Sequence, residues 1–152
     1  MDKKNNNVKA IAVLIKNTRT TIVMILAPEN LSDPEYFIPK GLFEKEALSV
    51  TTASAKAGPI RGSKGGVATA DFGIQMIDPE SYDAVVLVGG SGATVYFNDS
   101  RVHALLRDFH SLGKPVAAIC ISPTTLANAG LLNGRNATVW KDKDLISTLR
   151  EK

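Results

Sequence analysis

The sequence predicts an α/β fold in which a mostly parallel sheet is covered by helices on both faces. Apolar runs typical of buried strands alternate with segments that have the caps and the periodicity of helices. Two of these runs are residues 21–26 and 82–88, and a third, residues 116–119, leads directly into the only cysteine of the chain. Because parallel strands end at one edge of a sheet, we expect the residues that follow these runs to lie together.

The composition is that of one ordinary globular domain. The chain has 152 residues, of which 44% are hydrophobic and 22% are charged, so it can bury a single core. The net charge of +3 is spread along the chain, which predicts no nucleic-acid partner. No apolar run approaches the ~20 residues of a membrane span. A single cysteine excludes an internal disulfide and favours a reducing, cytoplasmic location.

Helices are predicted from caps and apolar spacing. Ser32 begins one helix, and Pro39 should kink or break it near Ile38. Asn98 or Asp99 caps a second helix. Its apolar face has the spacing i, i+3, i+4 and i+7 and consists of Val102, Leu105, Leu106 and Phe109. A third helix begins at Asp142 or Lys143.

The remaining segments are assigned from their apolar runs and from the glycine, proline and polar residues between them. Residues 8–15 and 49–54 have strand character, and residues 67–72 form one strand of a small hairpin. Residues 56–66 are rich in glycine, lysine and serine and are predicted to be a loop. Because they lack the order Gly-x-x-x-x-Gly-Lys-Ser/Thr, a nucleotide P-loop is rejected.

Cys120 lies on a predicted strand-to-helix turn. It follows the apolar run, and Ser122 and Pro123 come next as an N-cap and a first-turn proline. The N–H groups of a helix N-terminus lower a thiol pKa and can hold an oxyanion. The turn therefore predicts a reactive nucleophile on an elbow like that of serine hydrolases. The alternative is a buried cysteine that only packs as a small hydrophobic side chain.

Two further turns follow predicted strands. Gly89, Gly90 and Gly92 come after residues 82–88, where their backbone could approach a ligand and supply a second oxyanion donor. A plain tight turn is the alternative, and the Gly-x-Gly-x-x-Gly spacing of a Rossmann turn is absent. Glu29 follows residues 21–26 and is placed to reach a site at the sheet edge, although a solvated carboxylate in a turn would look the same.

Together these segments resemble the ThiJ/PfpI family, whose fold is flavodoxin-like, a three-layer sandwich related to the class I glutamine amidotransferases. The resemblance covers Thr21 to the end of the chain. It rests on Ala27-Pro-Glu-Asn30 with Tyr36-Phe37, Val88-Gly-Gly-Ser-Gly92, Ala118-Ile-Cys-Ile-Ser-Pro123, and Ala129-Gly-Leu-Leu-Asn-Gly134 leading to Ala137-Thr-Val-Trp140. The order and spacing of these motifs are more specific than any one of them.

The resemblance implies a set of site residues. They are the Cys120 thiol as nucleophile, the Glu29 carboxyl as its hydrogen-bonded partner, the backbone amides of Gly90 and Ile121 as the oxyanion hole, and Gly89 and Trp140 as substrate-binding residues. We expect Glu29 to be buried within hydrogen-bonding reach of the Cys120 sulfur. Neither metal nor cofactor is expected.

The function that the resemblance implies is glyoxalase- or deglycase-type chemistry on a small carbonyl substrate such as methylglyoxal. The alternative is a redox-sensing stress-response protein that works through oxidation of Cys120. A cysteine peptidase is less favoured because Ile121 stands where protease-like members have a histidine, and a non-catalytic scaffold is also less favoured. His103 and His110 are predicted to be surface residues. A homodimer or higher homo-oligomer is expected, without a membrane partner.

The same resemblance implies that the chain is divided into two regions. Residues 1–19 form an N-terminal tail or extension with a possible extra strand. Residues 20–152 are expected to form a single ThiJ/PfpI-like domain that lacks the C-terminal strand and helix usual in the family.

Overall fold

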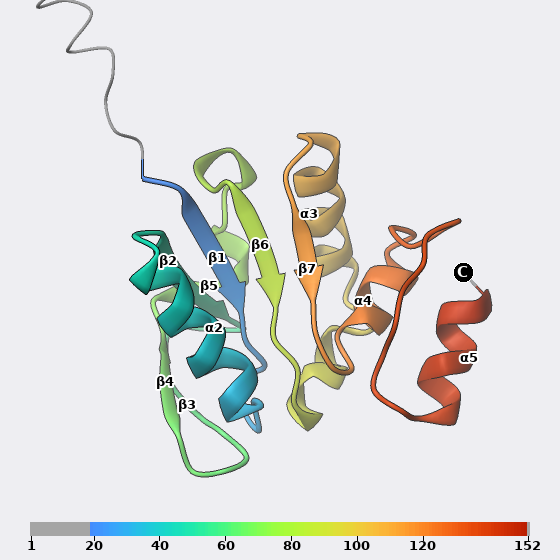
Figure 1. Cartoon of the computed structure of the whole chain (residues 1–152), viewed down its shortest axis with the longest axis horizontal. Coiled ribbons are helices and arrows are strands. Elements are labelled where there is room, and N and C mark those ends of the chain that lie inside the picture. The colour runs from blue at the N-terminus through green and yellow to red at the C-terminus, as the bar shows by residue number, and fades with distance from the viewer. Residues whose placement is uncertain (1–18, 152) are drawn as a thin grey trace, which may run out of the picture.

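The computed structural model describes residues 19–151, and the expected strand at residues 8–15 lies outside this range. The central sheet has five parallel strands in the order β5-β2-β1-β6-β7 (Figure 1). Their bounds are Thr21–Ile25 (β1), Ser49–Ser54 (β2), Phe72–Gly73 (β5), Ala84–Leu87 (β6) and Val116–Ala118 (β7). The strands predicted at residues 21–26, 49–54, 82–88 and 116–119 are thus confirmed, with slightly shorter bounds.

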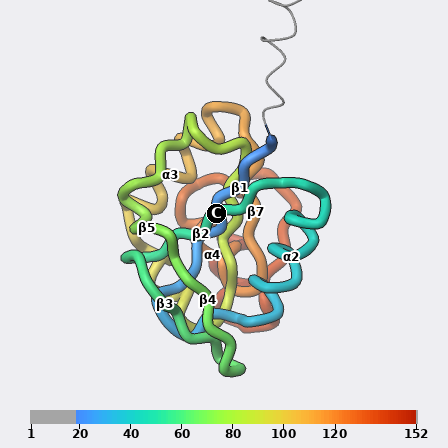
Figure 2. The backbone as a smooth tube through the Cα atoms, turned by 90° about the vertical axis from the view of Figure 1, so that its left-hand side faces the viewer, coloured from blue at the N-terminus to red at the C-terminus, as the bar shows by residue number. Residues whose placement is uncertain are grey.

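Helices cover both faces of this sheet, which confirms the predicted α/β sandwich (Figure 2). The α-helices are α2 (Asp33–Lys45), α3 (Ser100–Ser111), α4 (Pro123–Asn128) and α5 (Lys143–Glu151), and the 3-10 helices are η1 (Ile74–Met76), η2 (Pro79–Ser81) and η3 (Ser91–Tyr96). α2 packs on one face, and α3 and α4 pack on the other. Among residues 19–151, no helix is both long and apolar enough to cross a bilayer.

β1 forms the centre of the core because it is buried on both faces. Val23 and Ile25 pack into the cluster that contains Phe109 of α3. Ile22 and Met24 point the other way, into the cluster with Tyr36 of α2. Alternate side chains of a strand face opposite sides of a sheet, so a strand between two helical layers must be apolar throughout.

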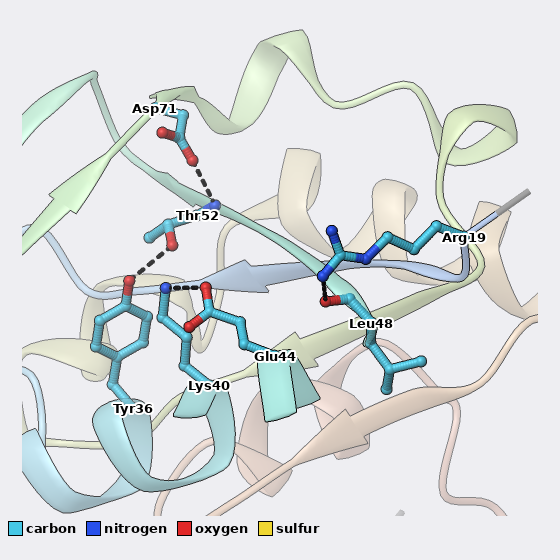
Figure 3. Close-up of polar contacts among 7 residues, drawn as sticks. All are labelled: Arg19, Tyr36, Lys40, Glu44, Leu48, Thr52 and Asp71. Atoms are coloured by element: carbon cyan, nitrogen blue, oxygen red, sulfur yellow. Dashed lines mark hydrogen bonds and ion pairs between the residues drawn. The ribbon is translucent and has the colours of Figure 1, made fainter. Parts of the chain in front are cut away.

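The helix α2 continues through Pro39, so the predicted break near Ile38 was wrong. Proline removes one helical N–H and crowds the preceding turn, and packing against the sheet offsets this cost. The buried Tyr36 hydroxyl shares a hydrogen bond of 2.8 Å with Thr52 Oγ1 of β2. Directly after Pro39, Lys40 forms an ion pair with Glu44, one turn further along the helix surface (Figure 3).

An antiparallel hairpin of β3 (Gly58–Arg61) and β4 (Val67–Ala70) lies beside α2. The predicted strand in residues 67–72 is confirmed, but residues 58–61 were predicted to be loop. Only Ile60 of β3 is buried. Gly58 and Pro59 before it are residue types typical of loops, so the sequence shows no strand pattern here. The carboxylate of Asp33 accepts hydrogen bonds from the N–H groups of Lys64 (2.8 Å) and Gly66 (2.6 Å), which tie the hairpin tip to α2 and lower the pKa of Asp33.

The caps predicted for the last two long helices are confirmed. Asp99 precedes α3 and accepts a hydrogen bond of 2.9 Å from the Arg101 N–H. All four residues of the predicted apolar face of α3 are buried. Asp142 caps α5 by accepting from the N–H groups of Asp144 (2.9 Å) and Leu145 (3.1 Å).

Candidate active site

The turns that follow β1, β6 and β7 meet at the carboxyl edge of the sheet, where the arrowheads of these strands point the same way in Figure 1. The Ser32 N–H donates to the Gly89 carbonyl (3.0 Å), which joins the start of α2 to the end of β6. The Ile119 N–H donates to the Leu87 carbonyl (3.2 Å), which joins the residue before Cys120 to β6. The predicted convergence of three strand ends is therefore present.

Cys120 occupies the elbow that the sequence predicted. Its φ of +64° is in the left-handed region, which costs a non-glycine residue about 1–2 kcal/mol. Three contacts hold this conformation. The Ser122 N–H closes a turn to the Ile119 carbonyl (3.1 Å), the buried Ser122 hydroxyl donates to the Val88 carbonyl (2.9 Å), and the Trp140 N–H donates to the Cys120 carbonyl (2.8 Å). Strain at one residue of a tightly bonded turn is typical of a functional position.

The acidic neighbour of Cys120 is Glu35, in the first turn of α2. The Glu35 carboxylate and the Cys120 side chain both border Gly89, and the charge of Glu35 raises the pKa of the Cys120 thiol. The Glu35 Oε2 also accepts from the Gly89 N–H at 3.1 Å. A Cβ added at Gly89 would collide with both Glu35 and Cys120, so only glycine fits between them. Glu35 is not among the site residues predicted from the sequence.

The position predicted for Glu29 was wrong. Its side chain is exposed, and none of the interactions of Cys120 in the described part of the chain involves it. After β1 the backbone bends at Asn30, whose φ is +50°, and Leu31 then forms a bridge with Gly62 of the hairpin. This bend turns Glu29 toward solvent and delivers the first turn of α2 to the sheet edge instead.

The pKa of the Cys120 thiol lies above its ordinary value. Burial raises it most, and the charge of Glu35 raises it further. The backbone N–H groups of Gly90 and Ile121 act in the opposite direction and lower it without reversing the shift. The predicted low thiol pKa was therefore wrong. Both N–H groups thus act on the thiol, and their role as an oxyanion hole stays a prediction.

Gly89 and Trp140, the two residues predicted to bind substrate, differ in exposure and in the hydrogen bonds that they make. Gly89 is buried and its N–H is used by Glu35, so it orients the carboxylate. The Trp140 side chain is 63% exposed, and its backbone is bonded to Cys120. Whether either touches a substrate stays a prediction.

The histidines lie on α3, where His110 is exposed and a ring nitrogen of His103 is 2.9 Å from the Phe97 carbonyl oxygen.

A substitution at Gly90 tests how closely the backbone is packed around this site. Its φ is +108°, and an added Cβ would collide with the backbone at Asn30 and Ser32. We expect Gly90→Ala to lower the free energy of unfolding by about 2–4 kcal/mol in urea denaturation. The control is Gly41→Ala in α2, where nothing lies within 4 Å, and this change should stabilise the protein by about 0.5–1 kcal/mol. Equal effects of the two substitutions would contradict the packing described here.

The comparisons with known proteins agree with this geometry. The model of the DJ-1/PfpI family matches residues 20–150. An uncharacterized protein of Methanocaldococcus jannaschii is 36% identical over 90% of this chain and 66% of its own length. A protein of Thermococcus kodakarensis named as a deglycase is 34% identical over 76% of this chain and 70% of its own length. The chain thus spans about two thirds of the length of these relatives.

Solved structures show the same fold. The ThiJ/PfpI domain protein from Brachyspira murdochii superposes with a TM-score of 0.82 at 30% identity, over 88% of this chain and 76% of that one. Drosophila melanogaster DJ-1beta superposes with a TM-score of 0.67 at 30% identity, over 74% of this chain and 61% of that one.

Proposed function

This chain belongs to the DJ-1/PfpI family, and on that basis we propose that it performs deglycase- or glyoxalase-type chemistry on reactive aldehydes such as methylglyoxal. Relatives in Thermococcus kodakarensis and Escherichia coli carry deglycase names at 34% identity, which supports the deglycase class. The observation that carries the proposal is the strained Cys120, which borders Gly89 together with the Glu35 carboxylate. The N–H groups of Gly90 and Ile121 also lower the pKa of its thiol.

The first step is attack of the Cys120 thiolate on the aldehyde carbon. A C–S bond forms, and the electron pair of the carbonyl moves to its oxygen. As the sulfur attacks, the thiol passes its proton to the Glu35 carboxylate, which acts as the general base. The N–H groups of Gly90 and Ile121 stabilise the oxygen as it becomes negative, and the Glu35 proton then completes the hemithioacetal.

The second stage moves protons and adds water. For methylglyoxal, the Glu35 carboxylate takes the proton from the carbon that bears sulfur and returns it to the neighbouring carbon, which gives the thioester of a 2-hydroxy acid. Water then cleaves the thioester and releases lactate and the Cys120 thiol. The sum is methylglyoxal plus water to lactate, so no external oxidant or reductant enters.

Lactate formation from methylglyoxal tests this function. The purified protein should produce one lactate for each methylglyoxal consumed, in the presence of a chelator and without added cofactor. Thiol addition that stops at the hemithioacetal would consume at most one aldehyde for each protein chain. Absence of repeated turnover would contradict the proposal.

Oxidation of Cys120 is the second candidate function. The same N–H groups and the Glu35 carboxyl could hold the oxygen atoms of a sulfenate or sulfinate. If the chain is a redox sensor, mild peroxide should add about 16 or 32 Da to the peptide that contains Cys120, as measured by mass spectrometry. No addition under conditions that oxidise free thiols would exclude this candidate.

A further inference from the structure

A pocket lies between α5 and residues 132–141, the segment that contains Trp140. Its volume is about 540 Å³. This volume is within the range of small-molecule sites. In Figure 1 the segment runs down between α4 and α5. The larger apolar side chains of the pocket wall are Leu132, Val139, Ile146 and Leu149.

The charged side chains of the pocket all have one sign. Arg135, Lys141 and Arg150 line it, and no acidic residue does. The ion pairs among residues 19–151 are Lys40–Glu44 and Arg101–Asp99, so none of these three cations has an acidic partner in the described part of the chain. Three like charges around one pocket repel one another, and an anion in the pocket would relieve that repulsion.

Two acidic residues near the pocket, Asp142 and Glu151, make hydrogen bonds to other groups. Ile146, Leu149 and Arg150 have the spacing i, i+3 and i+4, so one face of α5 lines the pocket. Glu151 lies off that face and accepts a hydrogen bond of 3.0 Å from the Ser147 hydroxyl. Asp142 is used as the helix cap. Neither these two acids nor Asp144 lines the pocket, and none forms an ion pair with its cations among the described residues.

We propose that this pocket binds a small amphipathic anion, an apolar body that carries a sulfonate, carboxylate or phosphate group. The apolar wall takes the body, and the cations of Arg135, Lys141 and Arg150 take the charged group by charge-assisted hydrogen bonds. This site is separate from the Cys120 site and does not depend on the aldehyde chemistry. Val139 and Lys141 of the pocket flank Trp140, the only tryptophan of the chain.

Energy transfer from Trp140 to a bound dye tests the proposal on the intact chain. Anilinonaphthalene sulfonate is an amphipathic anion, and phenylnaphthylamine has the same ring system without the sulfonate. The sulfonate should bind with transfer from Trp140, and its affinity should fall as salt is added. The neutral dye should bind at least about tenfold more weakly, since it makes no charge-assisted hydrogen bond.

Charge variants assign the site. Arg135→Gln, Lys141→Gln and Arg150→Gln should each weaken binding of the sulfonate by roughly fivefold to tenfold. Lys56→Gln removes an exposed cation of the β2–β3 turn and should leave binding unchanged. Far-UV circular dichroism and the melting temperature of each variant should match those of the parent, which separates loss of the site from loss of the fold. Equal affinity of both dyes, or of all four variants and the parent, would overturn the proposal.

Discussion

Glu35→Gln is expected to lower kcat for methylglyoxal by about 10²- to 10³-fold, the range typical for loss of a general acid–base group. Glutamine keeps the shape and still bonds to the Gly89 N–H, so the loss reports the missing proton carrier. The measurement is the steady-state rate of lactate formation.

Glu29→Gln is the matched control for this result. It makes the same chemical change on the same stretch of chain, but the Glu29 side chain is exposed and takes no part in the interactions described for Cys120. Its kcat should equal that of the parent. A loss in Glu29→Gln with full activity in Glu35→Gln would contradict the assignment of the carboxyl.

Cys120→Ser is expected to reduce turnover by roughly 10⁴-fold or more, as removal of a catalytic nucleophile does. A serine hydroxyl is not ionised near neutral pH, and Glu35 is the only acidic group that acts on this position in the described residues. Serine keeps the size of the side chain and the backbone contacts of the elbow. The free energy of unfolding should therefore change by less than about 1 kcal/mol.

The opposite pattern would identify Cys120 as a packing residue. In that case Cys120→Ser would lower the melting temperature because a hydroxyl replaces a half-buried thiol, and lactate formation would continue. Urea denaturation and the turnover assay on the same preparation distinguish the two outcomes.

The apolar patterns of the sequence predicted the parts of the fold that form the core. β1 and β6 were found as continuous apolar runs, and α3 was found because its inward side chains recur at the spacing of a helix. The elbow at Cys120 was predicted because Ser122 and Pro123 have known positions in a helix start. β3 was missed because one inward residue, Ile60, is too few for a period.

Glu35 was not predicted because its place depends on the path of the chain between β1 and α2. The bend at Asn30 and the bridge from Leu31 to Gly62 are tertiary features with no local pattern. One signal was available, since an acid in the first turn of a helix that follows a central strand lies near the same edge as the strand end. The direction of the Cys120 pKa shift was missed for the same reason, as burial and the Glu35 charge are both set by the fold.

The pH dependence of Cys120 alkylation by iodoacetamide, compared between the parent and Glu35→Gln, tests the pairing of these residues most directly. The chain has one cysteine, so the rate reports a single thiol. In the parent, burial and the Glu35 carboxylate hold the pKa of Cys120 above its ordinary value. Glu35→Gln removes the charge and should move the alkylation profile to lower pH, so the variant has more thiolate while its turnover is slower. A profile that stays in place or moves to higher pH would contradict the Cys120–Glu35 pair.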